Sequence, residues 1–456
     1  MDAIASYFKF AERGTTLATE VKAGVTTFAV MAYIIFLNPL ILGVSNADGV
    51  LVGPDPVAVG AGTALIAGIM TIAMGVVGNV PIAIAAGLGL NGVVAFGLIL
   101  GRGLTWQGAM GVIVIEGLVI ALLVLVGLRE AVMNAVPASL KRAIAVGIGL
   151  FILFIGAVDA GLVKSTGIAV PPVQFVFPTT MNHVVALAGL AVTVALYVMR
   201  VRAALLISIV FTTALAIIVT ELGLGTVKEF PTNLFSTGVD LSTIGQANLA
   251  EVFEKLGLLT AILVIFSIML SDFFDTMGTV TAISEEAGIM TEDGKVPNLS
   301  RVLLVDSVAA AAGGFAGVSS NTSYIESAAG VGEGGRTGFT SVVTGILFLV
   351  GIVAAPLVLL VPFEASGPVL ILVGFLLFGQ VRDIDFRDAE EGIPALLTLI
   401  LMPLSYDITV GIGAGFVSWV FIKVIRGKLS AIHPLMWVVS IAFLVYFARD
   451  WLQGII

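Results

Sequence analysis

Seven carboxylic acids lie within, or close to the ends of, strongly apolar stretches of this 456-residue chain. They are Glu116, Asp159, Asp272, Asp275, Asp306, Glu326 and Asp407. A charge near the centre of a bilayer costs about 3 kcal/mol on insertion scales, and no Lys or Arg lies mid-stretch to pair with them. Carboxyl groups in that setting hold a proton part of the time, or they contact a substrate or a cation.

Two of these acids, Asp272 and Asp275, lie three residues apart in one apolar segment. At that spacing they share a helix face. Two carboxylates so close together disfavour joint ionisation, so one of them is expected to hold a proton. The spacing therefore predicts a proton-coupled site. The alternative is that one of them caps or hydrogen-bonds a neighbouring broken helix.

Glu326 lies in a stretch that is poor in helix formers and begins with Asn321, Thr322 and Ser323. A carboxylate at the junction of extended backbone and a half-helix can face a ligand, and backbone N–H groups nearby can bind it too. We therefore expect Glu326 to bind substrate and, with Asp275 and Asp272, to couple protons. The alternative for Glu326 is a helix cap. The three residues before it are expected either to contact ligand or to hold the strand.

The remaining acids fit structural roles better. Glu116 and Asp306 are single intramembrane acids, and we expect interhelical hydrogen bonds from them. Asp159 and Asp407 lie near predicted helix ends, where a solvated position is expected.

The composition of the chain indicates the environment in which these acids lie. The chain is 59% apolar and only 11% charged, whereas a soluble domain is about a quarter charged. This excludes a soluble enzyme, a nucleic-acid binder and a disordered protein. With no Cys and only two His, neither a disulfide nor a Cys- or His-based metal centre is expected. No nucleotide-binding fingerprint is present in a strand–turn–helix context, so we expect no cofactor.

Apolar segments long enough to cross a bilayer recur along the whole chain. The first seven are 23–44, 57–79, 81–100, 107–127, 140–160, 183–199 and 202–220. After a polar stretch, 221–255, seven more follow at 256–283, 300–316, 317–332, 338–361, 366–380, 390–402 and 405–426. A final apolar segment, 431–450, is expected either to span or to lie along the interface.

The basic residues orient these segments. With the N-terminus in the cytoplasm, all but five of the 21 Lys and Arg fall on the cytoplasmic side. The five exceptions are Arg102, Lys164, Lys228, Lys255 and Arg449.

The third segment of each set, 81–100 and 317–332, is interrupted by Gly, Pro or Ser. Such matched broken segments are the best sequence pointer to the binding site of a transporter. The first segments of the two sets also correspond, with Asn38 level with Thr276. Both are candidate substrate contacts, although Asn38, next to Pro39, also suits bonding to backbone freed by a kink. Because seven is odd, the second set must be inverted relative to the first.

Three motifs make the chain recognisable: FAVMAYIIFLNP at 28–39, DFFDTMGT at 272–279 and NTSYIESAAGVGEGGRTG at 321–338. Together they resemble the AzgA-like purine permeases, a branch of the nucleobase–cation symporter-2 family. The resemblance implies fourteen transmembrane segments as two inverted repeats of seven, with short antiparallel strands in segments 3 and 10. It places the substrate between a core and a gate domain, and the family's two site carboxylates on Asp275 and Glu326. It also implies proton symport of adenine, guanine or hypoxanthine.

On this interpretation the chain divides into a cytoplasmic N-terminus and alternating core and gate parts. The expected boundaries are 1–22 for the N-terminus, 23–127 and 256–361 for the core, 128–222 and 362–426 for the gate, 223–255 for an extracytoplasmic connection and 427–456 for the C-terminal segment. The expected partners are a purine nucleobase, a proton, the lipid bilayer of the inner membrane and a second copy of the chain, with no nucleic acid.

The chemistry of the acids agrees with a purine. A purine base is neutral and planar and presents N–H donors along an edge, and one carboxylate accepts two such bonds at once. One alternative is an anion transporter on the same scaffold, which would require a cation or bare helix dipoles at the site. A second is an intramembrane enzyme with Mg²⁺ held by Asp272 and Asp275, but no further acidic motif at that depth completes such a site.

Overall fold

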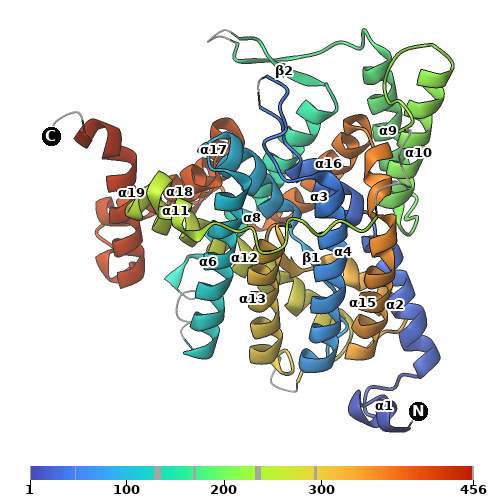
Figure 1. Ribbon diagram of the computed structural model, residues 1–456. Coiled ribbons are helices and arrows are strands. Elements are labelled where there is room, and N and C mark those ends of the chain that lie inside the picture. Colours follow the sequence, from blue (N-terminus) through green and yellow to red (C-terminus); the bar gives the residue numbers. More distant parts are fainter. Residues whose placement is uncertain are drawn as a thin grey trace.

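The computed structural model describes residues 2–46, 48–127, 135–167, 171–231, 238–291 and 295–453. Within these residues, eleven helices are long and apolar enough to cross a membrane. The protein is a helical membrane protein, with the N-terminal helix α1 (Asp2–Tyr7) at one face and a short β-hairpin at the other (Figure 1). We refer to these as the α1 face and the hairpin face.

The first half of the chain builds its segments largely from α-helices. Their bounds are α2 Leu17–Met31, α3 Ile34–Leu42, α4 Pro56–Ala73, α5 Leu88–Gly92, α6 Trp106–Leu125, α8 Ala138–Asp159, α9 Met181–Val198 and α10 Ala204–Glu221. Two π-helical stretches, η1 Met74–Gly78 and η2 Val93–Leu100, extend α4 and α5.

The second half follows the same order. Its helices are α12 Leu258–Glu286, α13 Leu299–Ala316, α14 Ala328–Gly332, α15 Gly338–Gly351, α16 Phe363–Phe378, α17 Ala389–Ser405 and α18 Ile408–Ile425. Four 3₁₀ stretches accompany them: η3 Ile325–Ser327, η4 Ile352–Leu360, η5 Gly379–Asp383 and η6 Leu429–Ala431. The predicted order of segments is thus confirmed.

Segments 3 and 10 each contain a strand, as the resemblance implied. Strand β1 (Ile84–Ala86) pairs antiparallel with β4 (Asn321–Ser323), with Ala85 opposite Thr322. All six residues are buried. Backbone that leaves the helix at membrane depth must have its N–H and C=O groups bonded by protein, and here each strand does this for the other.

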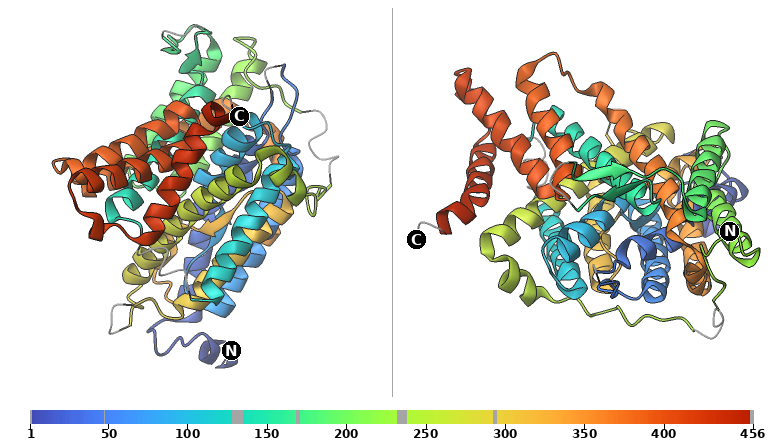
Figure 2. Two further views of the ribbon diagram at one scale, coloured as in Figure 1. Left: turned by 90° about the vertical axis from the view of Figure 1, so that its left-hand side faces the viewer. Right: turned by 90° about the horizontal axis from the view of Figure 1, so that it is seen from above.

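The helices pack as two groups. The first bundle contains α2 to α6 and α12 to α15, held by contacts such as α6 on α13 and α4 on α15. The second bundle contains α8 to α10 and α16 to α18, with α8 packed on both α16 and α17. Gly156 of α8 and Gly367 of α16 let those two helices approach closely, since a Cβ on either would meet the other's backbone. Figure 2 shows the same arrangement from two further directions.

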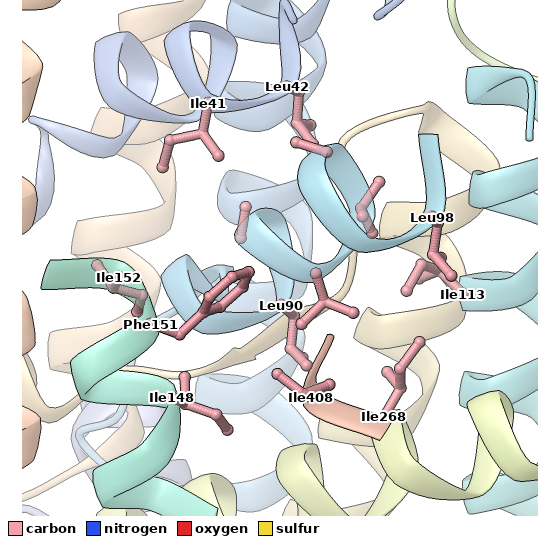
Figure 3. Close-up of a cluster of buried hydrophobic side chains, with 14 of the residues drawn as sticks. Ile41, Leu42, Leu90, Leu98, Ile113, Ile148, Phe151, Ile152, Ile268 and Ile408 are labelled. Carbon is pink, nitrogen blue, oxygen red and sulfur yellow. The ribbon is translucent and has the colours of Figure 1, made fainter. Parts of the chain in front are cut away.

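An apolar layer joins the two bundles. Phe151 and Ile152 of α8 pack with Leu90 of α5, Ile268 of α12 and Ile408 of α18 (Figure 3). These side chains are almost fully buried, so the bundles contact through a dry interface.

The C-terminal segment forms a helix, α19 (Pro434–Gln453), that packs along α18 and α12. Near its far end Tyr446 contacts Arg102, which follows η2. Two features were not predicted: helix α11 (Leu249–Leu256) within the polar stretch 221–255, and the hairpin of β2 (Val163–Ser165) and β3 (Val173–Phe175).

Candidate functional site

The site is built around the broken tenth segment. Helix α13 ends at Gly317 with φ +77°, Ser319 has φ +71°, and the chain then runs as strand β4 before the 3₁₀ turn η3. Positive φ at Gly317 stops the helix without a Cβ clash. Glu326 therefore lies at the point where extended backbone turns back into helix.

Asp306 of α13 holds this segment in place. Its Oδ1 accepts hydrogen bonds from the backbone N–H (2.9 Å) and the hydroxyl (2.7 Å) of Ser323, and its Oδ2 accepts one from the Thr276 hydroxyl at 2.6 Å. The Thr276 and Thr322 hydroxyls are also 2.9 Å apart. All four side chains are almost fully buried. The structure thus places Thr276, Thr322 and Ser323 in a scaffold that ties α12, α13 and β4 together.

The two amide side chains bond to protein as well. Asn38 donates to the hydroxyl of Thr63 (2.8 Å) and to the carbonyl oxygen of Val318 (3.1 Å). Asn321 donates to the carbonyl oxygen of Ser319 at 3.3 Å. Both are fully buried, so they connect the first segment and β4 to the turn before the strand.

Asp275 has a different environment. It is exposed although it lies midway along α12, and within the described residues it has no hydrogen bond or ion pair. Its carboxylate is within electrostatic range of Asp306 and Glu326. One turn further on, a Cβ added at Gly278 would meet nothing within 4 Å. Asp275 therefore faces open space on one side and the broken segment on the other.

Asp272 was expected to share a face with Asp275, but the two differ in burial. Asp272 is fully buried, whereas Asp275 is exposed. Residues three apart differ by about 60° around a helix, and here the edge of the accessible surface runs between them.

Glu326 is half-buried and receives a hydrogen bond that the sequence did not predict. The hydroxyl of Tyr33 donates to its Oε1 at 2.7 Å, and Tyr33 is fully buried at the break between α2 and α3. The sequence pointed to Tyr33 only through its place in the motif at 28–39, upstream of Pro39.

The other acids lie away from this opening. Glu116 is fully buried in α6, and its two oxygens have no hydrogen-bond partner among the described residues. The solvated position expected for Asp407 is wrong: its Oδ2 forms a 2.5 Å ion pair with Arg102, and its Oδ1 caps α18. The reason is that the end of η2 brings Arg102 up to the start of α18. Asp159 ends α8 and is half-buried within electrostatic range of Tyr406.

The second bundle contributes a cation beside the site and an aromatic cluster around Tyr406. The ammonium of Lys141 lies 5.6 Å from the ring centre of Phe274, the residue before Asp275. Tyr406 packs edge-on against Phe96, Phe151 and Phe154. Lys141 lies in the first turn of α8, near the start of the predicted segment 140–160.

The accessible surface at Asp275 continues in one direction only. Along α12 it runs through Gly278 and Ala282, and at the end of α14 Gly332 is exposed too. Toward the hairpin face, Ser319 and Ser320 are fully buried. The open side is the α1 face, because Arg13 of the N-terminal segment bonds the carbonyl oxygen of Arg336, just beyond α14. In the part of the chain that the structure describes, no group of three or more His, Cys, Asp or Glu is placed to hold a metal ion.

Comparison with known proteins identifies the group to which this arrangement belongs. A family model described as "Permease family" matches residues 18–414. The chain belongs to this permease family. It is therefore a multi-pass membrane transporter rather than an enzyme, and the resemblance seen in the three motifs is confirmed.

Curated relatives extend over nearly the full chain. The adenine permease AdeP of Escherichia coli is 38% identical over 440 residues, which cover 96% of this permease and 94% of that protein. The guanine/hypoxanthine permease PbuG of Bacillus subtilis is 37% identical over 447 residues, with coverage of 97% and 99%.

Solved structures show the same fold at low sequence identity. The transmembrane domain of a cyanobacterial bicarbonate transporter, BicA, superposes with a TM-score of 0.64 at 16% identity, over 88% of this permease and 97% of that chain. SLC26A9 superposes with a TM-score of 0.61 at 12% identity, over 89% of this permease and 66% of that chain. The permease thus has the inverted-repeat fold of fourteen segments, followed by α19.

Proposed function

We propose that the permease imports purine nucleobases of the adenine, guanine and hypoxanthine class by proton symport across the cell's inner membrane. The observation that carries the proposal is the pair of carboxylates, Asp275 on α12 and Glu326 on η3, which both belong to the second set of seven segments, lie within electrostatic range of each other and are both accessible. The named substrates of the relatives, adenine for one and guanine or hypoxanthine for another, support the class.

The geometry suits a neutral base with several N–H donors. Asp275 has both carboxylate oxygens available, whereas the Glu326 carboxylate already accepts from the Tyr33 hydroxyl and from its own backbone N–H and still has lone pairs left to accept from a ligand. A donor-rich edge of a purine satisfies these acceptors, whereas a ligand without donors leaves them unpaired in a poorly hydrated site. This difference would let the site select purine bases over ligands that lack N–H donors.

Proton coupling follows from the same acids. Asp275 lies within electrostatic range of Asp306 and Glu326, so the charge of this cluster changes when one member takes up a proton. We assign the coupling proton to Asp275, Glu326 or the buried Asp272. Binding of a base that donates to these oxygens then depends on which of them is ionised.

Alternating access is assigned to the two bundles, with the first as core and the second as gate. The core carries both carboxylates, and the apolar layer lies between core and gate (Figure 3). The excess of basic residues on that side supports a cytoplasmic α1 face, and on this orientation the opening at Asp275 is a cytoplasmic one. Movement of core against gate would close it and open the hairpin face.

A bicarbonate-type or other anion transporter is the second candidate, because the structural neighbours carry such titles. The site argues against it: acids surround the opening, and the cation lying beside it, Lys141, sits over an aromatic ring. An anion would have to enter a region that already carries negative charge.

Uptake into proteoliposomes tests the proposal. We expect accumulation of labelled adenine, guanine or hypoxanthine that a pH gradient drives and a protonophore abolishes. Asp275→Asn and Glu326→Gln should each lower uptake by at least tenfold. Glu285→Gln, the same change at an exposed position of α12, is the matched control and should leave uptake intact. Absence of purine uptake by the wild type, or uptake of bicarbonate instead, would overturn the proposal.

A further inference from the structure

Tyr33 is a buried side chain at an irregular point of the first segment. Helix α2 ends at Met31 and α3 begins at Ile34, so Ala32 and Tyr33 lie at the junction. There the backbone bonds shorten to an i to i+3 pattern, with Ile35 N–H donating to Ala32 and Phe36 N–H to Tyr33. The junction faces η3, which carries Glu326.

The hydroxyl of Tyr33 has a single hydrogen bond among the described residues, and it goes to the candidate site. The ring is fully buried, and the O–H donates to Glu326 Oε1 at 2.7 Å. A buried tyrosine hydroxyl requires a partner, and a carboxylate is the strongest acceptor that a side chain offers. The bond also joins segments 293 residues apart in the sequence.

The bond restricts how Glu326 can present itself. A free glutamate side chain samples many rotamers, and fixing it has an entropic cost that a ligand would otherwise have to overcome. The carboxylate also accepts from its own backbone N–H, and the two bonds together restrict its orientation while they leave lone pairs free to accept from a ligand. The side chain is half-buried, so the carboxylate is reachable from the opening.

We propose that Tyr33 is a positioning residue for the substrate site: it orients Glu326 by hydrogen bonding and does not itself touch the ligand. The inference rests on the proposed function in that it treats Glu326 as a ligand acceptor. It adds a residue from the first segment to a site otherwise built from α12 and the tenth segment.

A double-mutant cycle with purified protein in proteoliposomes tests this. The variants are Tyr33→Phe, Glu326→Gln and both together, with uptake of the preferred purine measured over a range of concentrations. Tyr33→Phe keeps the ring and removes only the donor, so KM should rise about tenfold while the maximal rate changes by less than twofold. In the Glu326→Gln background, Tyr33→Phe should add almost nothing, because the carboxylate that the bond orients is already gone.

Tyr197→Phe is the matched control, since Tyr197 is 40% exposed on α9 and lies outside the site. It should leave KM unchanged. A wild-type KM for Tyr33→Phe, or effects of Tyr33→Phe and Glu326→Gln that multiply independently, would overturn the inference while leaving purine transport intact.

An infrared measurement makes the test independent of any substrate. The carboxyl band of Glu326 is identified by its loss in Glu326→Gln, and it should shift in Tyr33→Phe but not in Tyr197→Phe. If the wild type transports no purine, the proposed function fails, and the infrared band still decides the role of Tyr33. An unshifted band in folded Tyr33→Phe refutes that role.

Discussion

An ion pair joins the two bundles at the hairpin face, and we expect that breaking it opens that face. Arg102, which follows η2 of the first bundle, pairs with Asp407 at the start of α18 in the second. The Arg102 guanidinium also donates to the Tyr446 hydroxyl at 3.1 Å. We predict that Asp407→Asn raises the population of molecules open at the hairpin face. Asparagine is the right replacement because it still caps α18, where Asp407 accepts from the Thr409 N–H at 2.8 Å.

The size of the effect follows from the burial of the pair. Its N–O distance is 2.5 Å, and the Arg102 and Asp407 side chains are only 11% and 20% exposed. Exposed ion pairs contribute about 0–1 kcal/mol, and breaking a fully buried one costs about 3–5 kcal/mol. A value between these, about 2 kcal/mol, corresponds to roughly a 30-fold change in the equilibrium between closed and open forms. The Arg202–Glu333 pair between the bundles at the α1 face involves an arginine that is 70% exposed, so it opposes the change only weakly.

Cysteine labelling measures this equilibrium directly, because the chain contains no cysteine of its own. Ser320 is fully buried on the hairpin side of β4, and Ser320→Cys changes one atom. Its reaction rate with a maleimide is proportional to the fraction of molecules open at that face. Asp407→Asn should raise this rate roughly 30-fold. Asp388→Asn is the control: Asp388 caps α17 through the Glu390 N–H at 2.9 Å, with no ion pair in the described part of the chain.

Two results would refute this reasoning. Equal labelling of Ser320→Cys in the Asp407→Asn and unmodified backgrounds would mean that the ion pair does not hold the face closed. Equal increases for Asp407→Asn and Asp388→Asn would trace the effect to a weakened helix cap. Labelling of Gly278→Cys, at the open end, gives the complementary signal and should fall as labelling of Ser320→Cys rises.

Three further predictions concern the scaffold and the opening. Gly278→Leu should abolish uptake by filling the opening. The melting temperature in detergent should stay within a few degrees of wild type, because leucine also favours helix. Retained uptake would show that the ligand does not pass there. Glu20→Gln should lower stability by about 3 kcal/mol, since its carboxylate accepts five hydrogen bonds from Arg336, Thr337 and Thr340, and thermal unfolding in detergent measures this loss. Burial raises the pKa of Glu251, but hydrogen bonds from Thr105 and the charge of Lys255 outweigh this and leave the pKa below its ordinary value. The stability that Glu251→Gln removes at neutral pH should therefore decrease as the pH falls below the ordinary glutamate pKa of about 4 and through the lower pKa of the folded state. A stability difference that does not decrease on acidification would contradict this.

Sequence reasoning recovered the order of the segments because hydropathy and the distribution of basic residues follow directly from the requirements of a bilayer. The broken segments were also visible, since Gly, Pro and Ser at membrane depth require special backbone. The pairing of β1 with β4 came from the resemblance, because three-residue strands carry no periodic signal of their own.

Individual side-chain contacts between distant parts of the chain could not be predicted from the sequence. Tyr33 reads as one more aromatic residue in an apolar helix, and only folding brings its hydroxyl to Glu326. Arg102 and Asp407 are 305 residues apart, and nothing local to either residue signals the ion pair. Asp272 and Asp275 share a predicted face, yet their burial depends on where the tenth segment crosses α12, which their spacing does not encode.

In this permease, the two proposed site acids differ from the other acids at membrane depth by combining unfilled acceptors with an accessible position. Neither property is enough by itself, since Glu116 has no hydrogen-bond partner among the described residues but is fully buried. Asp306 is fully buried and accepts three hydrogen bonds, so its acceptors are largely used by β4 and α12. In Asp407, Oδ2 pairs with Arg102 and Oδ1 accepts from the Thr409 N–H as a helix cap. Asp275 and Glu326 keep acceptors unfilled and face accessible space. An unfilled carboxylate at membrane depth is costly unless a ligand or a proton fills it, so we expect binding of a ligand or a proton at these two positions to release that free energy.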